Sequence, residues 1–206
     1  MNKTAVVIAV VAALVLLPAL ATAAVPQWLK NIIEKVKRAF PLNAVQIQSL
    51  NEIAAAFRVY GDGDPRKFAY IVATAWHESR LQPIREKKAA PGSYVWENYQ
   101  KKYWDTGFYG RGFVQITWED NYRKMGEFLG IPLVQNPDLA LQPDVAAKII
   151  VAGMMRGMFT GKSLLMYINA DGADYYNARR TVGAIMVAGT DTAALIEGYT
   201  KTILNA

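Results

Sequence analysis

The sequence contains no cysteine and only one histidine, His77, among its 206 residues. Without cysteine the chain has no disulfide, no thiolate nucleophile and no cysteine-bound metal. One histidine is too few for an ordinary zinc hydrolase site, and residue 81 is leucine, so His77-Glu78 does not begin a His-Glu-x-x-His motif. A serine triad would need His77 as its base, and the nearby Ser79 points to another side of a helix. What remains is carboxylate chemistry, and we expect no metal.

Acidic residues are outnumbered, with 17 Asp and Glu against 23 Lys and Arg, which gives a net charge of +6. A moderately basic protein is attracted to anionic surfaces such as nucleic acid, acidic lipid or acidic cell-wall polymers. The chain has no run of five basic residues and no nucleic-acid-binding motif, so nucleic acid is not the expected partner. Its length and its 52% hydrophobic content suit one domain with a real core.

The only long hydrophobic run lies at the N-terminus. Lys3 precedes an unbroken apolar stretch at 5–17, and Pro18 and the small residues of 21–23 follow. This is the order of a secretory signal peptide. Residues 5–25 are also long enough, at roughly 20 residues, to span a bilayer as a retained signal-anchor. Both interpretations of 1–25 stay open, and each predicts an export or membrane step.

Residues 26–42 form an amphipathic segment. Trp28, Ile32, Val36 and Phe40 recur at helical spacing, with basic residues between them. Such a helix either lies on a lipid surface beside the membrane segment or packs on the domain that follows. The sequence does not decide between the two.

Residues 43–206 are expected to form a single, mainly α (α+β) domain. Periodicity and capping residues predict helices near 45–57, 65–80, 119–129, 143–158 and 192–204. Asp64 is placed to cap the second of these, with Pro65 at its first position. Alternation of side chains predicts one strand at 113–118.

Two carboxylates are the candidates for chemistry. Glu78 shares a helix face with Ile71 and Ala75, and a carboxyl group in apolar surroundings has a raised pKa, as a general acid requires. The alternative is a surface residue at a frayed helix end, paired with Arg80 or Arg85. Glu86 lies beyond Pro83 in a wetter loop, where a carboxylate stays ionised, and an acid facing an ionised base is the arrangement of glycoside hydrolysis.

Other features in this region allow two interpretations each. Glu97 and Asp105 compete with Glu86 for the role of base. Gln115 and Thr117 share one face of the predicted strand and could hold a water or a sugar hydroxyl, while Thr117 also begins a capping-box-like pattern. The aromatic-rich segment 92–106 is either a wall for a sugar substrate or packing beneath a long loop.

Several blocks together resemble glycoside hydrolase family 19, and they resemble its phage and bacterial lysozyme-like branch more closely than plant chitinases. The blocks stand in the family's order between about residues 57 and 200. They are Trp76-His77-Glu78-Ser79, Pro83-Ile84-Arg85-Glu86, Tyr109-Gly110-Arg111-Gly112-Phe113-Val114-Gln115-Ile116-Thr117-Trp118, Asn121-Tyr122, Leu133-Val134-x-Asn136-Pro137-Asp138-Leu139 and Asn177-Ala178-Arg179-Arg180.

The resemblance implies a lysozyme-like fold, with helices around a substrate cleft and a small β-hairpin. It implies inverting hydrolysis of a β-1,4-linked amino sugar chain, with Glu78 as acid, Glu86 as the counterpart of the base and Thr117 helping to hold the water. Arg179 or Arg180 corresponds to the arginine that braces the carboxylates. The implied substrate-binding residues are Tyr109, Gln115, Asn121, Tyr122 and Asn136, together with the arginine pair.

The leading hypothesis is a monomeric peptidoglycan hydrolase of the endolysin type, with no cofactor. It would act in the periplasm, outside the cell, tethered by 5–25 to a membrane that faces the wall, or in a virion. A secreted chitinase is the second hypothesis. The third, from another class, is a catalytically inactive, membrane-tethered glycan-binding protein on the same fold.

Overall fold

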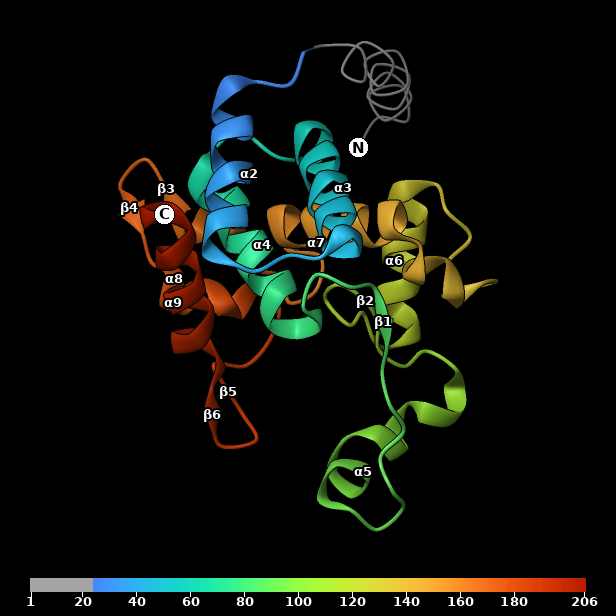
Figure 1. Ribbon diagram of the computed structural model, residues 1–206. Helices are drawn as coiled ribbons and strands as arrows, with labels where there is room; N and C mark the ends of the chain where they lie inside the picture. The colour runs from blue at the N-terminus through green and yellow to red at the C-terminus, as the bar shows by residue number, and fades with distance from the viewer. Residues whose placement is uncertain (1–23) are drawn as a thin grey trace.

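The computed structural model describes residues 24–206 (Figure 1). The segment predicted as a signal peptide or signal-anchor therefore lies almost entirely outside the described residues. Between residues 24 and 206, no helix is both long and apolar enough to cross a membrane.

Helices make up most of the described chain, as the sequence predicted. The longer ones are α2 (Gln27–Ala39), α3 (Ala44–Tyr60), α4 (Pro65–Ser79), α6 (Glu119–Leu129), α7 (Pro143–Arg156) and α9 (Thr192–Asn205). The short ones are α5 (Tyr94–Asn98), α8 (Tyr175–Ala178) and the 3-10 turns η1 (Gln100–Lys102), η2 (Trp104–Thr106), η3 (Pro137–Leu141), η4 (Leu164–Met166) and η5 (Arg179–Thr181).

The β structure consists of short antiparallel pairs. They are β1 (Ile84–Arg85) with β2 (Arg111–Gly112), β3 (Ile168–Asn169) with β4 (Gly172–Ala173), and β5 (Met186–Val187) with β6 (Thr190–Asp191). The predicted class, mainly α with a small β element, is confirmed.

The predicted helix boundaries rest on local capping chemistry. Asn43 caps α3 in a capping box with Gln46. Asp64 accepts from the backbone N–H of Arg66, with Pro65 at the first helical position of α4. Gly130 ends α6 in the left-handed conformation, which glycine adopts without steric cost.

Helix α4 is the centre of the core. All eight residues from Phe68 to Ala75 have zero exposure, and the helix packs against α2, α3, α7 and α9 (Figure 1). The sequence predicted one apolar face, which includes Ile71 and Ala75. The other faces are also covered, because small residues such as Ala69 and Ala73 let neighbouring helices approach closely.

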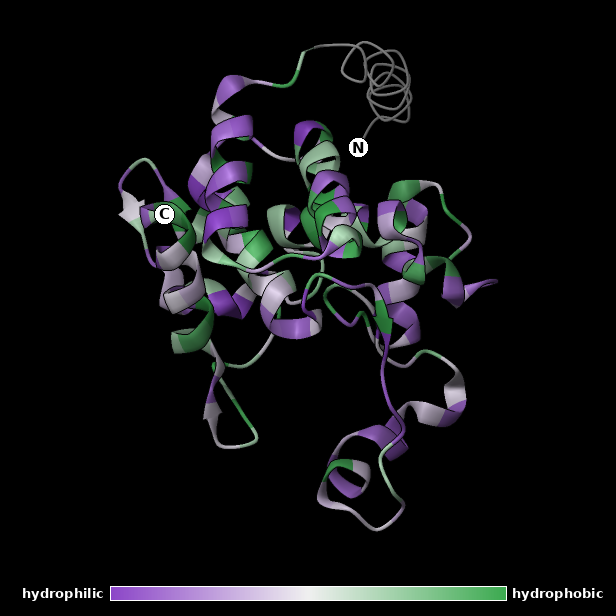
Figure 2. Ribbon diagram, viewed as in Figure 1, coloured by the Kyte–Doolittle hydropathy of each residue, from purple (hydrophilic) through white to green (hydrophobic). Residues whose placement is uncertain are grey.

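Helix α2 belongs to the same core. Leu29, Ile32 and Val36 are buried in the core cluster, and the ring of Phe40 stacks on Trp76 at 4.4 Å between centroids. The side of α2 turned to the viewer in Figure 2 is mostly hydrophilic. Of the two interpretations of this amphipathic segment, the one in which it packs on the domain therefore holds, and its apolar face is not available to lipid.

The strand predicted at 113–118 is wrong. Arg111 and Ile116 exchange two backbone hydrogen bonds, of 3.3 and 3.0 Å, and Gln115 has a φ of +56°, so the residues between them form a tight turn. The cap predicted for Thr117 is also wrong. Trp118 is the N-cap residue of α6, and the hydroxyl of Thr117 donates to the carbonyl of Gln115 at 2.9 Å.

Truncation of a buried residue of α2 tests whether this helix is part of the domain. Leu29→Ala should lower the free energy of unfolding by about 2–5 kcal/mol, because it leaves a cavity in the core. The matched control is Lys30→Ala on the exposed side of the same helix, which should change stability by less than about 0.5 kcal/mol. Urea unfolding measures both, and equal small effects would contradict the packing of α2.

Candidate active site

Glu78 lies in the last turn of α4, where the helix leaves the core. The next residues, Arg80 and Leu81, both have left-handed backbone conformations, with φ of 54° and 55°. Two consecutive left-handed residues other than glycine are unusual and reverse the chain sharply. The amide side chain of Gln46 donates to the carbonyl of Arg80 at 2.8 Å and so supports the turn. The chain reaches β1 at Ile84 within a few residues of Glu78.

Arg179 holds the carboxylate of Glu78. Its Nη1 donates to Oε1 of Glu78, and its Nε donates to the carbonyl of Ala184 at 3.1 Å. The side chains are 8% and 19% exposed, so this ion pair is largely shielded from water. The sequence left Arg179 and Arg180 as alternatives. Arg180 is exposed and donates to Asn177 at 3.2 Å, so Arg179 is the arginine beside Glu78.

The charged partner of Glu78 comes from a segment 101 residues further along the chain, the segment to which the family resemblance pointed, and not from Arg80 or Arg85. The arginine bonds Oε1, so Oε2 is the oxygen on which a general acid would carry its proton.

Glu86 accepts three hydrogen bonds. Gln100 Nε2 and the hydroxyl of Tyr103 donate to Oε1 at 2.7 and 2.8 Å, and the backbone N–H of Gly110 donates to Oε2 at 2.8 Å. An ionised carboxylate accepts hydrogen bonds and donates none, so it can take all three. Its competitors are placed differently, since Glu97 pairs with Lys101 and Asp105 is exposed.

Gly110 brings Glu86 and Gln115 together. A Cβ atom at Gly110 would lie 2.9 Å from Gln115 Oε1 and 3.1 Å from Glu86 Oε2, so a larger residue here would require these side chains to shift. The amide nitrogen of Gln115 donates to the carbonyls of Ile84 and Gly112 at 3.0 and 2.9 Å. Gln115 thereby ties the turn after β2 to both paired strands.

The buried side chain of Arg111 holds β2 in place. Its buried side chain donates to Asp138 at 2.8 Å and to the hydroxyl of Tyr122 at 3.1 Å, and its guanidinium lies 4.0 Å from the centre of the Tyr109 ring. Tyr122 is itself fully buried and donates to the carbonyl of Tyr109 at 2.8 Å. Burial raises the pKa of Tyr122 to about 12, against the lowering effect of Arg111.

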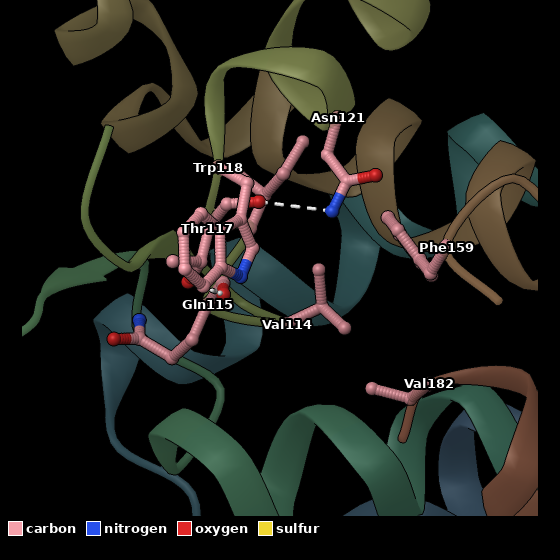
Figure 3. A pocket seen from close by; sticks show the side chains of 8 residues that line it. Val114, Gln115, Thr117, Trp118, Asn121, Phe159 and Val182 are labelled. Atoms are coloured by element: carbon pink, nitrogen blue, oxygen red, sulfur yellow. Dashed lines mark hydrogen bonds between the residues drawn. The ribbon is translucent and has the colours of Figure 1, made fainter. Parts of the chain in front are cut away.

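A pocket of about 290 Å³ lies beside these groups (Figure 3). Figure 3 shows Val182 and Phe159 facing Val114 across it, with Asn121 on α6 above. The amide of Asn121 donates to the carbonyl of Thr117 at 2.9 Å. Gln115, Thr117 and the half-exposed Trp118 line the pocket, whereas neither Glu78 nor Glu86 does.

Two of the residues that line the pocket, Val182 and Gln115, are nevertheless close to the groups that hold Glu78 and Glu86 in place. Val182 follows the η5 turn that carries Arg179, and Gln115 lies against Gly110 together with Glu86. Among the residues predicted to bind substrate, Gln115 and Asn121 line the pocket, and so does Thr117, which was predicted to help hold the water. Tyr122 supports the site from within the core, and Asn136 is exposed at the start of η3.

The lone histidine next to Glu78 is neutral at physiological pH. Burial lowers the pKa of His77, and Arg179 and Arg80 act in the same direction against the opposite effect of Glu78. A neutral His77 places no additional positive charge next to Glu78.

The family model for chitinase class I, glycoside hydrolase family 19, matches residues 52–156, which is just over half of the chain. The chain belongs to glycoside hydrolase family 19. The family resemblance predicted from the sequence is thus confirmed. Glu78, Glu86, Gln115 and Thr117 all lie within the matched range.

Curated relatives of this family 19 chain include two endochitinases of Arabidopsis thaliana. They are 32% identical over 135 residues and 33% identical over 129 residues. The matches cover 62% and 59% of this chain but 46% and 44% of the plant proteins. The chain therefore spans about half the length of the curated relatives it matches.

Solved structures support the fold. Chitinase C from Streptomyces griseus is 20% identical with a TM-score of 0.56, over 89% of this chain and 77% of that one. A bacterial family 19 chitinase is also 20% identical with a TM-score of 0.51, over 82% of this chain and 93% of its own. At this identity the likeness shows the fold alone, and it agrees with the lysozyme-like fold expected for family 19.

The Asp138 carboxylate provides a pH-dependent test of the site's scaffold. Burial would raise its pKa, but hydrogen bonds from Arg111 and Arg85 hold the pKa of Asp138 below its ordinary value of 3.8. A carboxyl group with a lowered pKa contributes stability above its unfolded pKa and loses it as the pH falls through the folded value.

Asp138→Asn should therefore lower the free energy of unfolding at pH 7 by about 1 kcal/mol, since Asp138 is half exposed and water screens its charge. The difference between the two proteins should shrink as the pH falls below 3.8. Urea unfolding at several pH values measures it, and a difference that stays constant down to pH 2 would contradict the ion pairs as its cause.

Proposed function

We propose that this chain hydrolyses β-1,4 bonds between amino sugars by an inverting mechanism, with Glu78 as general acid and Glu86 as general base. The observation that carries the proposal is the difference between the two carboxylates. One sharp turn separates them in the chain, yet Glu78 is held on one oxygen by Arg179 and Glu86 is held by three neutral donors. Two carboxylates in different environments suit different proton-transfer roles.

The hydrogen bonds to the carboxylate oxygens of Glu78 and Glu86 indicate which oxygen of each takes part in the proposed reaction. Glu78, held through Oε1, delivers a proton from Oε2 to the glycosidic oxygen while the bond to the anomeric carbon breaks. Glu86 takes a proton from the water that attacks this carbon from the opposite face. Room for that water requires a carboxyl separation of roughly 6.5–9.5 Å. The hydroxyl of Thr117 donates to Gln115, so its lone pairs are left to accept from the water.

For the substrate we propose the glycan of peptidoglycan, as in the endolysin-type branch of the family. The basic charge of the chain suits an anionic wall, and the N-terminal sequence suits export or a membrane tether facing the wall. Chitin is the second candidate, because the relatives and solved structures that match are chitinases. We propose that the protein acts as a monomer without a cofactor.

Isosteric replacement of each carboxylate tests the mechanism. Glu78→Gln and Glu86→Gln should each lower the rate of glycan cleavage by at least about 100-fold, because each removes one proton transfer. The matched control is Glu97→Gln, which changes a carboxylate paired with Lys101 on the exposed surface. Release of reducing ends measures all of them. Full activity of Glu86→Gln would move the role of base to another residue.

The substrate is decided by running the same proteins on two polymers. Clearing of outer-membrane-stripped Gram-negative cells without release of sugar from colloidal chitin would support peptidoglycan, and the reverse result would support chitin. Mass analysis of the wall fragments then names the bond. Binding to either polymer with no cleavage, unchanged by Glu78→Gln, would support the inactive glycan-binding hypothesis.

The two adjacent arginines allow a matched comparison. Arg179→Lys removes the planar group that bonds both Glu78 and Ala184, so cleavage should fall by roughly 10–100-fold through loss of orientation of the acid. Arg180→Lys, on an exposed residue bonded to Asn177, should leave the rate within about twofold. Initial rates on the same glycan measure both, and equal losses would contradict the assignment of Arg179.

A further inference from the structure

The segment between β1 and β2 contains a pair of polar side chains that point back to Glu86. Gln100 is 2% exposed and Tyr103 is 8% exposed, although both belong to a segment that extends away from the helical body in Figure 1. Both donate to the same atom, Oε1 of Glu86. Buried polar groups in an otherwise exposed segment call for a specific role.

Their spacing explains how they converge. Gln100 begins the η1 turn, and Tyr103 follows at its end, with its N–H bonded to the carbonyl of Gln100 at 3.1 Å. In a 3-10 turn, side chains three residues apart lie one above the other. The exposed residues between them, Lys101 and Lys102, take the other sides of the turn. One turn thus aims two donors at one carboxylate oxygen.

Gln100 has no freedom to swing away. Its Nε2 bonds Glu86 at 2.7 Å and the carbonyl of Lys87 at 2.8 Å, while its Oε1 accepts from the N–H of Ala89 at 2.6 Å. All three bonds tie it to the chain just after β1. The amide orientation is therefore fixed by both of its ends, and with it the position of Glu86 Oε1.

Tyr103 is held equally well and remains a donor. Its ring packs edge-on against Trp118, with 5.1 Å between centroids, and the next residue, Trp104, stacks on Tyr109 at 4.4 Å. Burial raises the pKa of Tyr103 above its ordinary value, and the bond to Glu86 and its negative charge raise it further. The phenol therefore keeps its proton at any physiological pH.

We infer that Gln100 and Tyr103 are positioning residues for Glu86, which fix Oε1 so that Oε2 faces the attacking water. The inference rests on the proposed role of Glu86 as base. With Oε1 bonded twice, Oε2 carries only the bond from Gly110 N–H and has a lone pair free for a proton. Among residues 24–206, these three groups donate hydrogen bonds to the carboxylate, and the charged side chains next to it in the chain, Arg85 and Lys87, are exposed.

Tyr103→Phe tests this with a change of one hydroxyl. The ring and its contact with Trp118 are kept, so the melting temperature should stay within about 2 °C of the wild-type value. We expect kcat for glycan cleavage to fall about tenfold, with KM within about twofold. Because a donor to the ionised base is lost, the acidic limb of the pH–rate profile should move to higher pH.

Tyr60→Phe is the matched control, since Tyr60 lies on α3 and packs against Phe128, away from Glu86. It should show neither effect. In a Glu86→Gln background, Tyr103→Phe should cause no further loss, because residues that act as a unit are not additive. A loss of kcat that comes with a lower melting temperature and an unmoved acidic limb would overturn the inference and leave Tyr103 a structural residue.

A measurement without substrate separates this inference from the proposed function. In protein labelled with carboxyl-¹³C glutamate, the signal of Glu86 is identified by its loss in Glu86→Gln. Its titration should move to higher pH in Tyr103→Phe but not in Tyr60→Phe. An unmoved titration would overturn the positioning role alone. Full glycan cleavage by Glu86→Gln would overturn both proposals, since no base would then need positioning.

Discussion

The burial of α4 on all sides is the constraint on which the rest of the structure depends. Eight consecutive residues without solvent contact must be covered by neighbouring helices, and α2, α3, α7 and α9 supply that cover. A helix enclosed in this way can meet solvent only at its ends. The last turn of α4 carries Glu78, so the position of the proposed acid is set by the packing of the core. The same enclosure brings Arg179 beside Glu78, since α8 and the η5 turn pack on α9, which in turn packs on α4.

The turn after α4 then separates two kinds of environment within a few residues. Before it, Glu78 is held by a charged partner from the far end of the chain, across a buried interface. Beyond it, Glu86 is held by neutral donors from the segment that joins β1 to β2. Left-handed Arg80 and Leu81 make so short a connection feasible, and their backbone strain is offset by the burial of Leu81 and the bond from Gln46.

Features determined by neighbouring residues could be predicted from the sequence. Asp64 with Pro65 and the glycine at 130 mark helix ends through local backbone chemistry, and both were placed correctly. The alternation at 113–118 misled, because a compact turn with buried Phe113 and Val114 gives a pattern much like that of a strand. The partners of Glu86 could not be predicted, since they lie 14 and 17 residues away and no periodicity links them. The partner of Glu78 lies 101 residues away, and only the family resemblance pointed to it, with Arg179 and Arg180 left as alternatives.

The long connection between β1 and β2 supplies both side-chain partners of Glu86, Gln100 and Tyr103. Two residues suffice to join an antiparallel pair, whereas this connection runs from 86 to 110. Long connections in compact domains are usually functional. Here the bond from Gly110 N–H to Glu86 joins its two ends, and Trp104 stacks on Tyr109 within it. Its middle contributes side chains that β1 and β2 alone could not bring to this carboxylate. The added length therefore acts on the proposed base, while Arg179 holds Glu78, and the two carboxylates are fixed by separate parts of the fold.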